Sequence, residues 1–266
     1  RVLINLLRFI LRILKRILIP STARYIRLSP NLKGKIWFYD RKFKKFFNIK
    51  SRGFIDSITA DQIYSFNDYD LSFLKRYDQI LKKYNEILNS NKIPLIIDCG
   101  ANIGLSAKFF SEEFPESKIV AIEPDKSNIL MAQKNCAAIS NIEFLEAAIG
   151  STSGNVQISN SDADPNSFRV DRSSSDYDIK VFQIQDILKK FNDIELFITK
   201  IDIEGFEDDL FKRNTEWIDK CYLIIIELHD WMMPNTANSN NFLKSISSFK
   251  RDFIYKEENI FSIKND

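Results

Sequence analysis

An alternation of short apolar runs with amphipathic segments, beginning near residue 93, is the feature that most restricts the fold. Apolar runs occupy residues 94–98, 118–122, 142–145, 196–201 and 221–228. Apolar residues have helical spacing in the intervening segments 105–114, 126–138 and 206–217. This alternation predicts an α/β fold in which helices cover both faces of a doubly wound, mostly parallel sheet. After residue 242 the sequence predicts another helix and then an antiparallel C-terminal hairpin with strands near 253–255 and 260–263.

Charged residues follow the ends of these predicted strands. Asp98 and Glu123 end the first two, and Glu146, Asp202 and His229 follow the other three in order. Ligands of open parallel sheets bind beyond the carboxyl ends of the strands, where these residues would converge. We therefore expect the functional site at this edge of the sheet.

The segment Asp98-Cys-Gly-Ala-Asn-Ile-Gly104 predicts a tight glycine loop between a strand and a helix. Dinucleotide-binding loops carry a middle glycine that lets the backbone approach a pyrophosphate, and this segment lacks it. A carboxylate at Glu123 can accept hydrogen bonds from both hydroxyls of a ribose, and Asp98 suits a cationic amino group. Together these features favour S-adenosylmethionine, which contains no phosphate. The alternatives are tight strand–helix packing at Gly100 and Gly104 and a surface position for Glu123.

Five segments, IIDCGANIG, IVAIEPD, AAIG, ITKIDIEGFEDDLF and IIIELHD, resemble the FkbM-type family of S-adenosylmethionine-dependent methyltransferases over residues 93–230. The resemblance implies a class I methyltransferase (Rossmann-like) fold and methyl transfer to oxygen on natural-product or carbohydrate acceptors. In such a fold the corner after the third strand lies near the adenine, which implies a backbone contact at Ala147. The remaining implied cofactor contacts are Asp98, Gly100, Ala101, Asn102, Gly104 and Glu123.

The fourth predicted strand ends with Lys200, Asp202 and Glu204, which an extended backbone would place on one face. Charges at the end of an apolar strand are costly unless they are paired or functional. We predict that Asp202 lies at the reacting centre, and an internal Lys200–Asp202 ion pair is the alternative. Lys200 is a second candidate catalytic residue, and Glu204 has a supporting role.

His229, the only histidine, follows the fifth strand, and its ordinary pKa suits a general base near neutral pH. The alternative is a histidine bonded at the edge of the core. A mechanism assisted by Mg²⁺ would use Asp202 with Asp230, or with Asp162 and Asp164, but the spacing does not favour it. We therefore predict no metal ligand.

Two further functions stay open from the sequence. A nicotinamide-dependent oxidoreductase is disfavoured because the loop lacks the middle glycine. A methyltransferase-like binding or scaffold protein, recruited to a membrane and without turnover, would keep the same loop. The preferred prediction is an O-methyltransferase that acts on a small-molecule or glycan acceptor.

The first 92 residues lie outside the alternating pattern. In residues 1–19, basic side chains share one arc of a helical wheel and apolar side chains fill the rest. This pattern predicts a basic amphipathic helix that lies on a membrane surface or packs on protein, not a spanning helix or a signal peptide. We predict a mainly helical extension over residues 20–92 and the methyltransferase domain over residues 93–266. Within that domain, a hairpin around Ser153-Gly154 is expected to lead into a polar loop.

Composition argues against several other classes. Lys and Arg total 38 and Asp and Glu total 36, so a net charge of +2 gives no general signal for nucleic-acid binding. The three cysteines form no CxxC pair, which disfavours a zinc ribbon or a disulfide scaffold. We expect a cytoplasmic protein, and it would be peripheral to the membrane if residues 1–19 lie on a membrane surface rather than on protein.

Overall fold

The computed structural model describes residues 23–29, 34–158, 170–171 and 179–265. The chain forms two compact units that meet in sequence at Asp68 and Tyr69, and each is considered separately. The amphipathic segment 1–19 and the loop residues Asp162 and Asp164 lie outside the described residues. Among the described residues, none of the helices is long and apolar enough to cross a bilayer.

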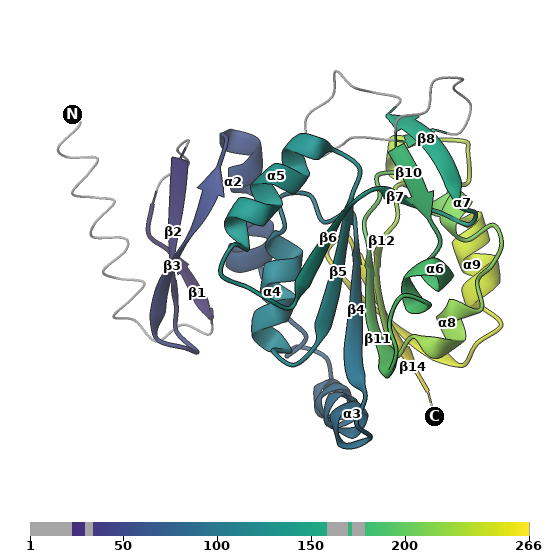
Figure 1. Cartoon of the computed structure of the whole chain (residues 1–266), viewed down its shortest axis with the longest axis horizontal. Helices are drawn as coiled ribbons and strands as arrows, with labels where there is room; N and C mark the ends of the chain where they lie inside the picture. Colours follow the sequence, from purple (N-terminus) through teal and green to yellow (C-terminus); the bar gives the residue numbers. More distant parts are fainter. Residues whose placement is uncertain (1–22, 30–33, 159–169, 172–178, 266) are drawn as a thin grey trace. The chain divides into compact units, whose positions relative to one another are not determined.

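A seven-stranded sheet forms the centre of the larger unit (Figure 1), in the order β13-β14-β12-β11-β4-β5-β6. β14 runs antiparallel to β12 and β13, and all other neighbours are parallel. This arrangement confirms the predicted doubly wound, mostly parallel sheet with an antiparallel C-terminal hairpin. The strands are β4 (Ile93–Cys99), β5 (Lys118–Glu123), β6 (Ile142–Glu146), β11 (Ile194–Ile201), β12 (Leu223–Glu227), β13 (Arg251–Lys256) and β14 (Asn259–Lys264).

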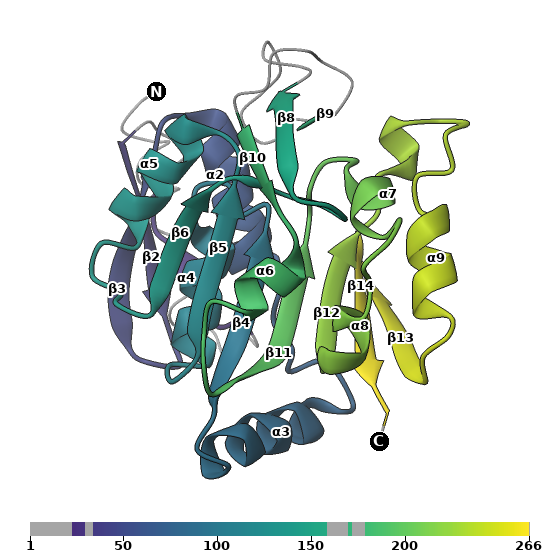
Figure 2. The ribbon, with the colours of Figure 1, turned by 45° about the vertical axis from the view of Figure 1, so that its right-hand side comes forward.

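Helices cover both faces of this sheet (Figure 2). One face carries α3 (Tyr77–Asn89), α4 (Leu105–Glu113) and α5 (Lys126–Asn135). The other carries α6 (Ile184–Leu188), α7 (Glu207–Leu210), α8 (Trp217–Lys220) and α9 (Asn240–Ile246). Because the central strands are covered on both faces, they are apolar along nearly their whole length.

The order of strand connections reverses between β4 and β11. From β4 the chain continues to β5 and β6 on one side, whereas β11 leads to β12 on the other. Parallel sheets of this kind have a crevice at the carboxyl ends of the two strands beside the reversal. The register sets Asp98 opposite Lys200, so two of the predicted site residues are neighbours across strands.

Two local predictions for this unit were wrong. The helix predicted over 206–217 is two short helices, α7 and α8, because the chain turns at Asn214, which has a left-handed backbone (φ 56°). Its amide donates hydrogen bonds to the Ser151 carbonyl and the Gln183 side chain, which fix this turn. The hairpin around Ser153-Gly154 is absent from the described residues, since β10 (Ile179–Phe182) lies between β7 (Ala148–Ile149) and β8 (Gly154–Ile158). β9 (Val170–Asp171) pairs with the far edge of β8.

The smaller unit is built around an antiparallel sheet, which the prediction of a mainly helical extension did not include. The sheet consists of β1 (Tyr25–Arg27), β2 (Gly34–Asp40) and β3 (Lys45–Ser51), followed by α2 (Phe54–Ala60) and the π-helix η1 (Asp61–Ser65). Alternating aromatic and β-branched residues favour strands here, and Phe38, Phe47, Tyr25 and Tyr64 pack as its aromatic core. α3 belongs to the larger unit, so the compact boundary follows residue 68 rather than 92.

Candidate active site

Asp98 ends β4 at the reversal of strand order and is fully buried. Its Oδ2 accepts a hydrogen bond of 2.5 Å from the hydroxyl of Ser106, in the first turn of α4. Its Oδ1 has no hydrogen-bond partner among the described residues, and the Nζ of Lys200 lies 3.4 Å away. A buried carboxylate oxygen that lacks a donor is costly, so this atom is a strong candidate to receive a ligand's N–H group.

The two glycines of the loop allow close packing, as the structural alternative proposed. Gly100 has φ +81°, and a Cβ on it would lie 1.7 Å from the carbonyl oxygen of Asp202. Gly104 has φ +80°, and its Cβ would lie 2.8 Å from the Cβ of Ala132 in α5. Both positions therefore require glycine, because the end of β11 and α5 approach the loop so closely.

The backbone N–H groups of the loop already have acceptors. Gly100 and Ala101 both donate to the Ile122 carbonyl at 2.9 Å, Asn102 donates to Glu123 Oε2 at 2.9 Å, and Gly104 donates to the Ala101 carbonyl at 2.8 Å. A loop that binds a pyrophosphate must present such groups to the ligand. These four N–H groups are committed, so the loop is not built for phosphate.

Glu123 is a buried side chain at the end of β5, which overturns the alternative of a surface charge. Its carboxylate also accepts hydrogen bonds from the Asp125 backbone at 3.0 Å and the Asn128 amide at 3.2 Å. Burial raises the pKa of Glu123 to about 7, although these hydrogen bonds oppose the shift. The backbone N–H of Ala147 donates to the Glu123 carbonyl and is therefore not available to a ligand.

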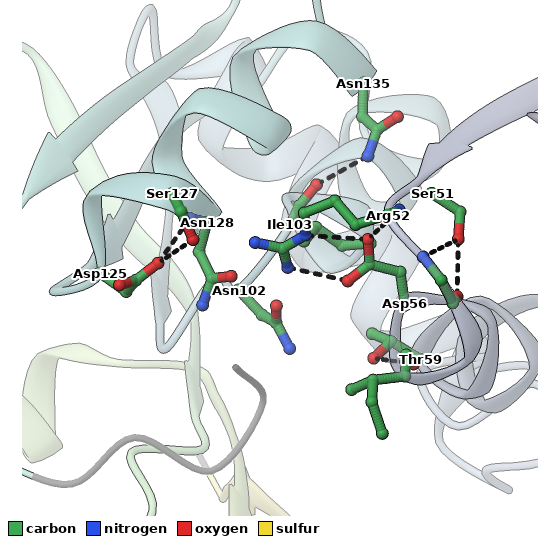
Figure 3. Close-up of polar contacts among 12 residues, drawn as sticks. Ser51, Arg52, Asp56, Thr59, Asn102, Ile103, Asp125, Ser127, Asn128 and Asn135 are labelled. Atoms are coloured by element: carbon green, nitrogen blue, oxygen red, sulfur yellow. Dashed lines mark hydrogen bonds and ion pairs between the residues drawn. The ribbon is translucent and has the colours of Figure 1, made fainter. Parts of the chain in front are cut away.

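Side chains at the start of α5 hold this corner in place. Asp125 caps the helix by accepting hydrogen bonds from the Asn128 backbone and the Ser127 hydroxyl (Figure 3). Near its other end, Asn135 donates to the Ile103 carbonyl of the loop at 3.1 Å. The buried Oδ1 of Asn102 has no partner within the described part of the chain. After Asp98 Oδ1, it is the second buried acceptor of this segment that lacks a hydrogen-bond donor among the described residues.

Lys200 connects the ends of β4 and β11. Its buried ammonium donates to the Gly100 carbonyl at 2.7 Å and lies 3.3 Å from Asp202 Oδ2. Burial opposes its charge, but Asp202, Tyr69 and Asp98 raise its pKa well above the usual value. Lys200 is therefore a fixed cation between two carboxylates, and the Lys200–Asp202 ion pair, given above as the alternative to a role at the reacting centre, is present.

His229 lies among carboxylates from three segments. Its Nδ1 is 2.9 Å from Glu207 Oε1, and its Nε2 is 3.4 Å from Glu227. Burial opposes protonation, but the hydrogen bonds to Glu207 and Glu227, with the nearby negative charges, raise the pKa of His229 to about 11. A histidine that is already protonated cannot accept a proton, so this environment argues against the predicted role of general base.

The acidic end of β11 and β12 has more carboxylates than cations. We use the name acidic cluster for Asp202, Glu204, Glu207 and Glu227 together with His229. Glu204 has a left-handed backbone (φ 52°), and its Oε2 lies 3.6 Å from His229 Nε2. Burial and repulsion from Asp202 raise the pKa of Glu204 to about 8. The cluster therefore contains a partly exposed carboxyl group that titrates near neutral pH.

With this geometry established, comparison with known proteins identifies the family. The FkbM methyltransferase domain model matches residues 98–255, more than half of the chain. The chain belongs to the FkbM methyltransferase family. A curated relative, methyltransferase sdnD of Sordaria araneosa, is 29% identical over 107 residues, covering 38% of this chain and 40% of the relative. The match thus spans about two fifths of that relative's length.

Solved structures similar to this FkbM methyltransferase include the FkbM methyltransferase of Methylobacillus flagellatus KT, with a TM-score of 0.44 and 20% identity. That match covers 64% of this chain and 43% of the other. The N-terminal domain of human METTL16, in complex with SAH, has a TM-score of 0.40 and 14% identity, covering 72% and 70% of the two chains. The predicted family is thus confirmed by the domain match, and the predicted class I fold agrees with the strand order described above.

The sequence prediction missed several residues of the FkbM methyltransferase site. Ser106 and Asn128 hold Asp98 and Glu123, respectively, and Glu207 accepts from both His229 and Asn238. Glu227 could have been noticed, because it is the first charged residue after the apolar run of β12. The others sit on helices or loops whose approach to the strand ends cannot be seen in the sequence.

The acidic cluster does not fit a metal ion as it stands. Asp202, Glu227 and His229 each offer an atom within 4.8 Å of the others. His229 coordinates a metal only when neutral, whereas its carboxylate neighbours hold it protonated. Asp230, the other predicted partner within the described residues, accepts the backbone N–H of Ser239. The protonated His229 and the engaged Asp230 therefore add no support to the Mg²⁺ alternative.

Proposed function

We propose that this chain transfers the methyl group of S-adenosylmethionine to a hydroxyl oxygen of a carbohydrate or another small natural-product acceptor. The observation that carries the proposal is Asp98 Oδ1, a buried acceptor with no hydrogen-bond donor among the described residues, beside a loop in which four backbone N–H groups are already engaged. Such a site suits a ligand with a cationic amino group and no phosphate. Membership of a methyltransferase family supports the same choice.

The residues of the loop and of β5 suit the parts of this cofactor. Asp98 would accept from its amino group, and Glu123 would accept from one ribose hydroxyl at its remaining acceptor position. A carboxylate has about four acceptor positions, and Glu123 uses three of them within the protein. Gly100, Ala101, Asn102 and Gly104 would line the cofactor through the loop backbone, and Ala147 would pack beside the adenine without donating its N–H group.

The protein's own contribution to the reaction is to orient the acceptor and to remove its proton. When bound, S-adenosylmethionine supplies an electrophilic methyl group. The hydroxyl proton of the acceptor would pass to a carboxylate of the chain as the acceptor oxygen is methylated. Glu204 would receive this proton, because its pKa of about 8 lies close to neutral pH. Asp202 would orient the hydroxyl.

His229 and Lys200 would act as positioning residues. The imidazolium of His229 balances the charges of Glu207 and Glu227, and Lys200 fixes the Gly100 carbonyl and Asp202. With Asp98 included, five carboxylates surround these two cations. The resulting negative charge would favour the cationic S-adenosylmethionine over the product S-adenosylhomocysteine, whose sulfur is uncharged.

Calorimetric titration with S-adenosylhomocysteine tests the cofactor assignment. Wild type should bind saturably, and Glu123→Ala should bind at least about tenfold more weakly because it loses charge-assisted hydrogen bonds. Glu116→Ala, which removes an exposed carboxylate before the opposite end of β5, should bind like wild type. No binding by folded wild-type protein would refute the proposal.

Turnover needs a separate measurement, because a binding protein without activity would pass the titration. Formation of S-adenosylhomocysteine should be measured with hydroxylated glycans and natural products as acceptors. Methylation at oxygen, located by mass spectrometry, is the expected result. Saturable cofactor binding without turnover on any acceptor would favour the scaffold function, and methylation at nitrogen or carbon would overturn the choice of oxygen.

A further inference from the structure

The hairpin formed by β2 and β3 in the smaller unit has a strong excess of positive charge. Residues 34–51 contain five lysines, one arginine and a single acidic residue, Asp40. The turn itself reads Arg41-Lys-Phe-Lys-Lys45, and all of its lysines are exposed. The whole chain has a net charge of only +2, so this concentration is local.

Arginines neutralise the carboxylates near this hairpin. Asp40 is fully buried and bonded to Arg24 at 3.0 Å. Asp56 is also buried and pairs with Arg52 at 2.8 Å (Figure 3). Asp61 is bonded to Arg27 in the same way. These three carboxylates are thus paired with arginines, while the lysines of the hairpin face outward.

Exposed aromatic rings accompany these lysines. Phe43, within the turn, is 47% exposed, and Phe46, at the start of β3, is 64% exposed. The ammonium groups of Lys42 and Lys45 lie 5.3 Å and 5.2 Å from the centre of the Phe43 ring. The strand alternation also turns Trp37 outward, while its neighbours Ile36 and Phe38 are buried.

We propose that this hairpin binds the surface of an anionic lipid bilayer. The lysines and Arg41 would lie against lipid phosphates, and the Phe43 and Phe46 rings would enter the boundary between headgroups and acyl chains. Phenyl rings have no hydrogen-bonding groups, so their exposure among cations fits a surface that is both charged and apolar. A purely ionic partner such as heparin would use the lysines and leave the exposure of these rings unexplained.

The sequence that precedes the hairpin points to the same partner. Residues 1–19 combine basic and apolar residues in the pattern expected of an interfacial helix. Stable peripheral binding generally requires two signals, since one weak anchor is reversible. The hairpin would supply one signal, and its contribution can be separated from that of residues 1–19 by substitutions confined to the turn.

Co-sedimentation of the full chain with vesicles tests the proposal. The test compares vesicles of phosphatidylcholine that contain about 30 mol% phosphatidylglycerol with vesicles of pure phosphatidylcholine. The triple variant K42Q/K44Q/K45Q should partition onto the anionic vesicles roughly 100-fold less, at about fivefold for each lost charge. The matched control K134Q/K189Q/K244Q removes three exposed lysines of the larger unit and should bind like wild type.

A second variant separates a membrane from other polyanions. F43S/F46S keeps every charge and should reduce vesicle partitioning by on the order of tenfold, while binding to heparin stays unchanged. Circular dichroism and the melting temperature confirm that the variants fold. The proposal is overturned if wild type does not bind anionic vesicles, if the two lysine variants lose equal affinity, or if F43S/F46S binds vesicles like wild type.

Discussion

The candidate site has two halves, at the ends of β4 and β5 and at the ends of β11 and β12, which stabilise their buried charges differently. At the ends of β4 and β5, Asp98 and Glu123 are held mainly by hydroxyl, amide and backbone donors. In the acidic cluster at the ends of β11 and β12, carboxylates face one another around His229. The first half is suited to hold a ligand in one position, and the second half is suited to exchange protons.

This difference has a direct energetic meaning. Hydrogen-bond donors oppose the rise in pKa that burial causes at Glu123, whereas in the acidic cluster repulsion between carboxylates adds to that rise. Glu204 is the clear case, with a pKa of about 8 caused by burial and by Asp202. We therefore assign cofactor recognition to the β4–β5 half and proton transfer to the acidic cluster.

Lys200 touches both halves, so its removal should have the largest effect. Lys200→Met leaves Asp98 and Asp202 without their shared cation, and we expect a loss of about 3–5 kcal/mol in the free energy of unfolding. Urea denaturation followed by circular dichroism measures this loss. Because that variant could fail to fold, the double variant K200M/D98N provides the control. It should recover part of the loss, and equal stability of the two variants would show that Asp98 does not depend on Lys200.

Glu204→Gln tests the acidic cluster alone. If Glu204 accepts the hydroxyl proton, the substitution should lower kcat by about 10²–10⁴-fold while the affinity for S-adenosylhomocysteine stays unchanged. In wild type, kcat should rise with pH up to about pH 8, the pKa of Glu204, and this rise should be absent from the variant. A wild-type pH profile retained by Glu204→Gln would assign the proton to another group.

The sequence predicted the first half of the site better than the second. Asp98, the glycine loop and Glu123 lie at the ends of consecutive strands, so the alternation of strands and helices is sufficient to bring them together. The pKa of His229 depends on Glu207, the first residue of α7, and the spacing of residues does not predict that the start of this helix meets the end of β12. Charge pairing across elements depends on register and loop paths, which residue spacing does not encode.

Gly100→Ala measures how closely the two halves approach each other. The new methyl group would meet the Asp202 carbonyl at 1.7 Å and also disfavour the backbone at φ +81°. We expect a loss of about 2–3 kcal/mol in stability from this strain. Gly104→Ala is the matched comparison, since it has the same φ penalty but meets a side chain in α5 at 2.8 Å. Thermal unfolding should rank Gly100→Ala as the more damaging, and the reverse order would contradict the close approach.

The pH dependence of stability gives the smallest change per step, at most about 1.4 kcal/mol per pH unit, and it separates the contributions of Glu123 and His229. His229 binds its proton more tightly in the folded state, where its pKa is about 11, than in the unfolded chain, where it is 6.5. Its contribution to stability is therefore complete below pH 6.5 and is lost as pH rises through 11, at about 1.4 kcal/mol per pH unit at most. The pKa of Glu123 is raised from 4.5 to about 7. Its contribution to stability therefore also falls as pH rises, but only between those two pH values. Urea unfolding from pH 5 to 10 should thus show stability that falls with pH, with Glu123→Gln flattening the slope below pH 7 and His229→Gln flattening it above. Stability that rises between pH 7 and 10 in wild type would contradict the protonated state of His229.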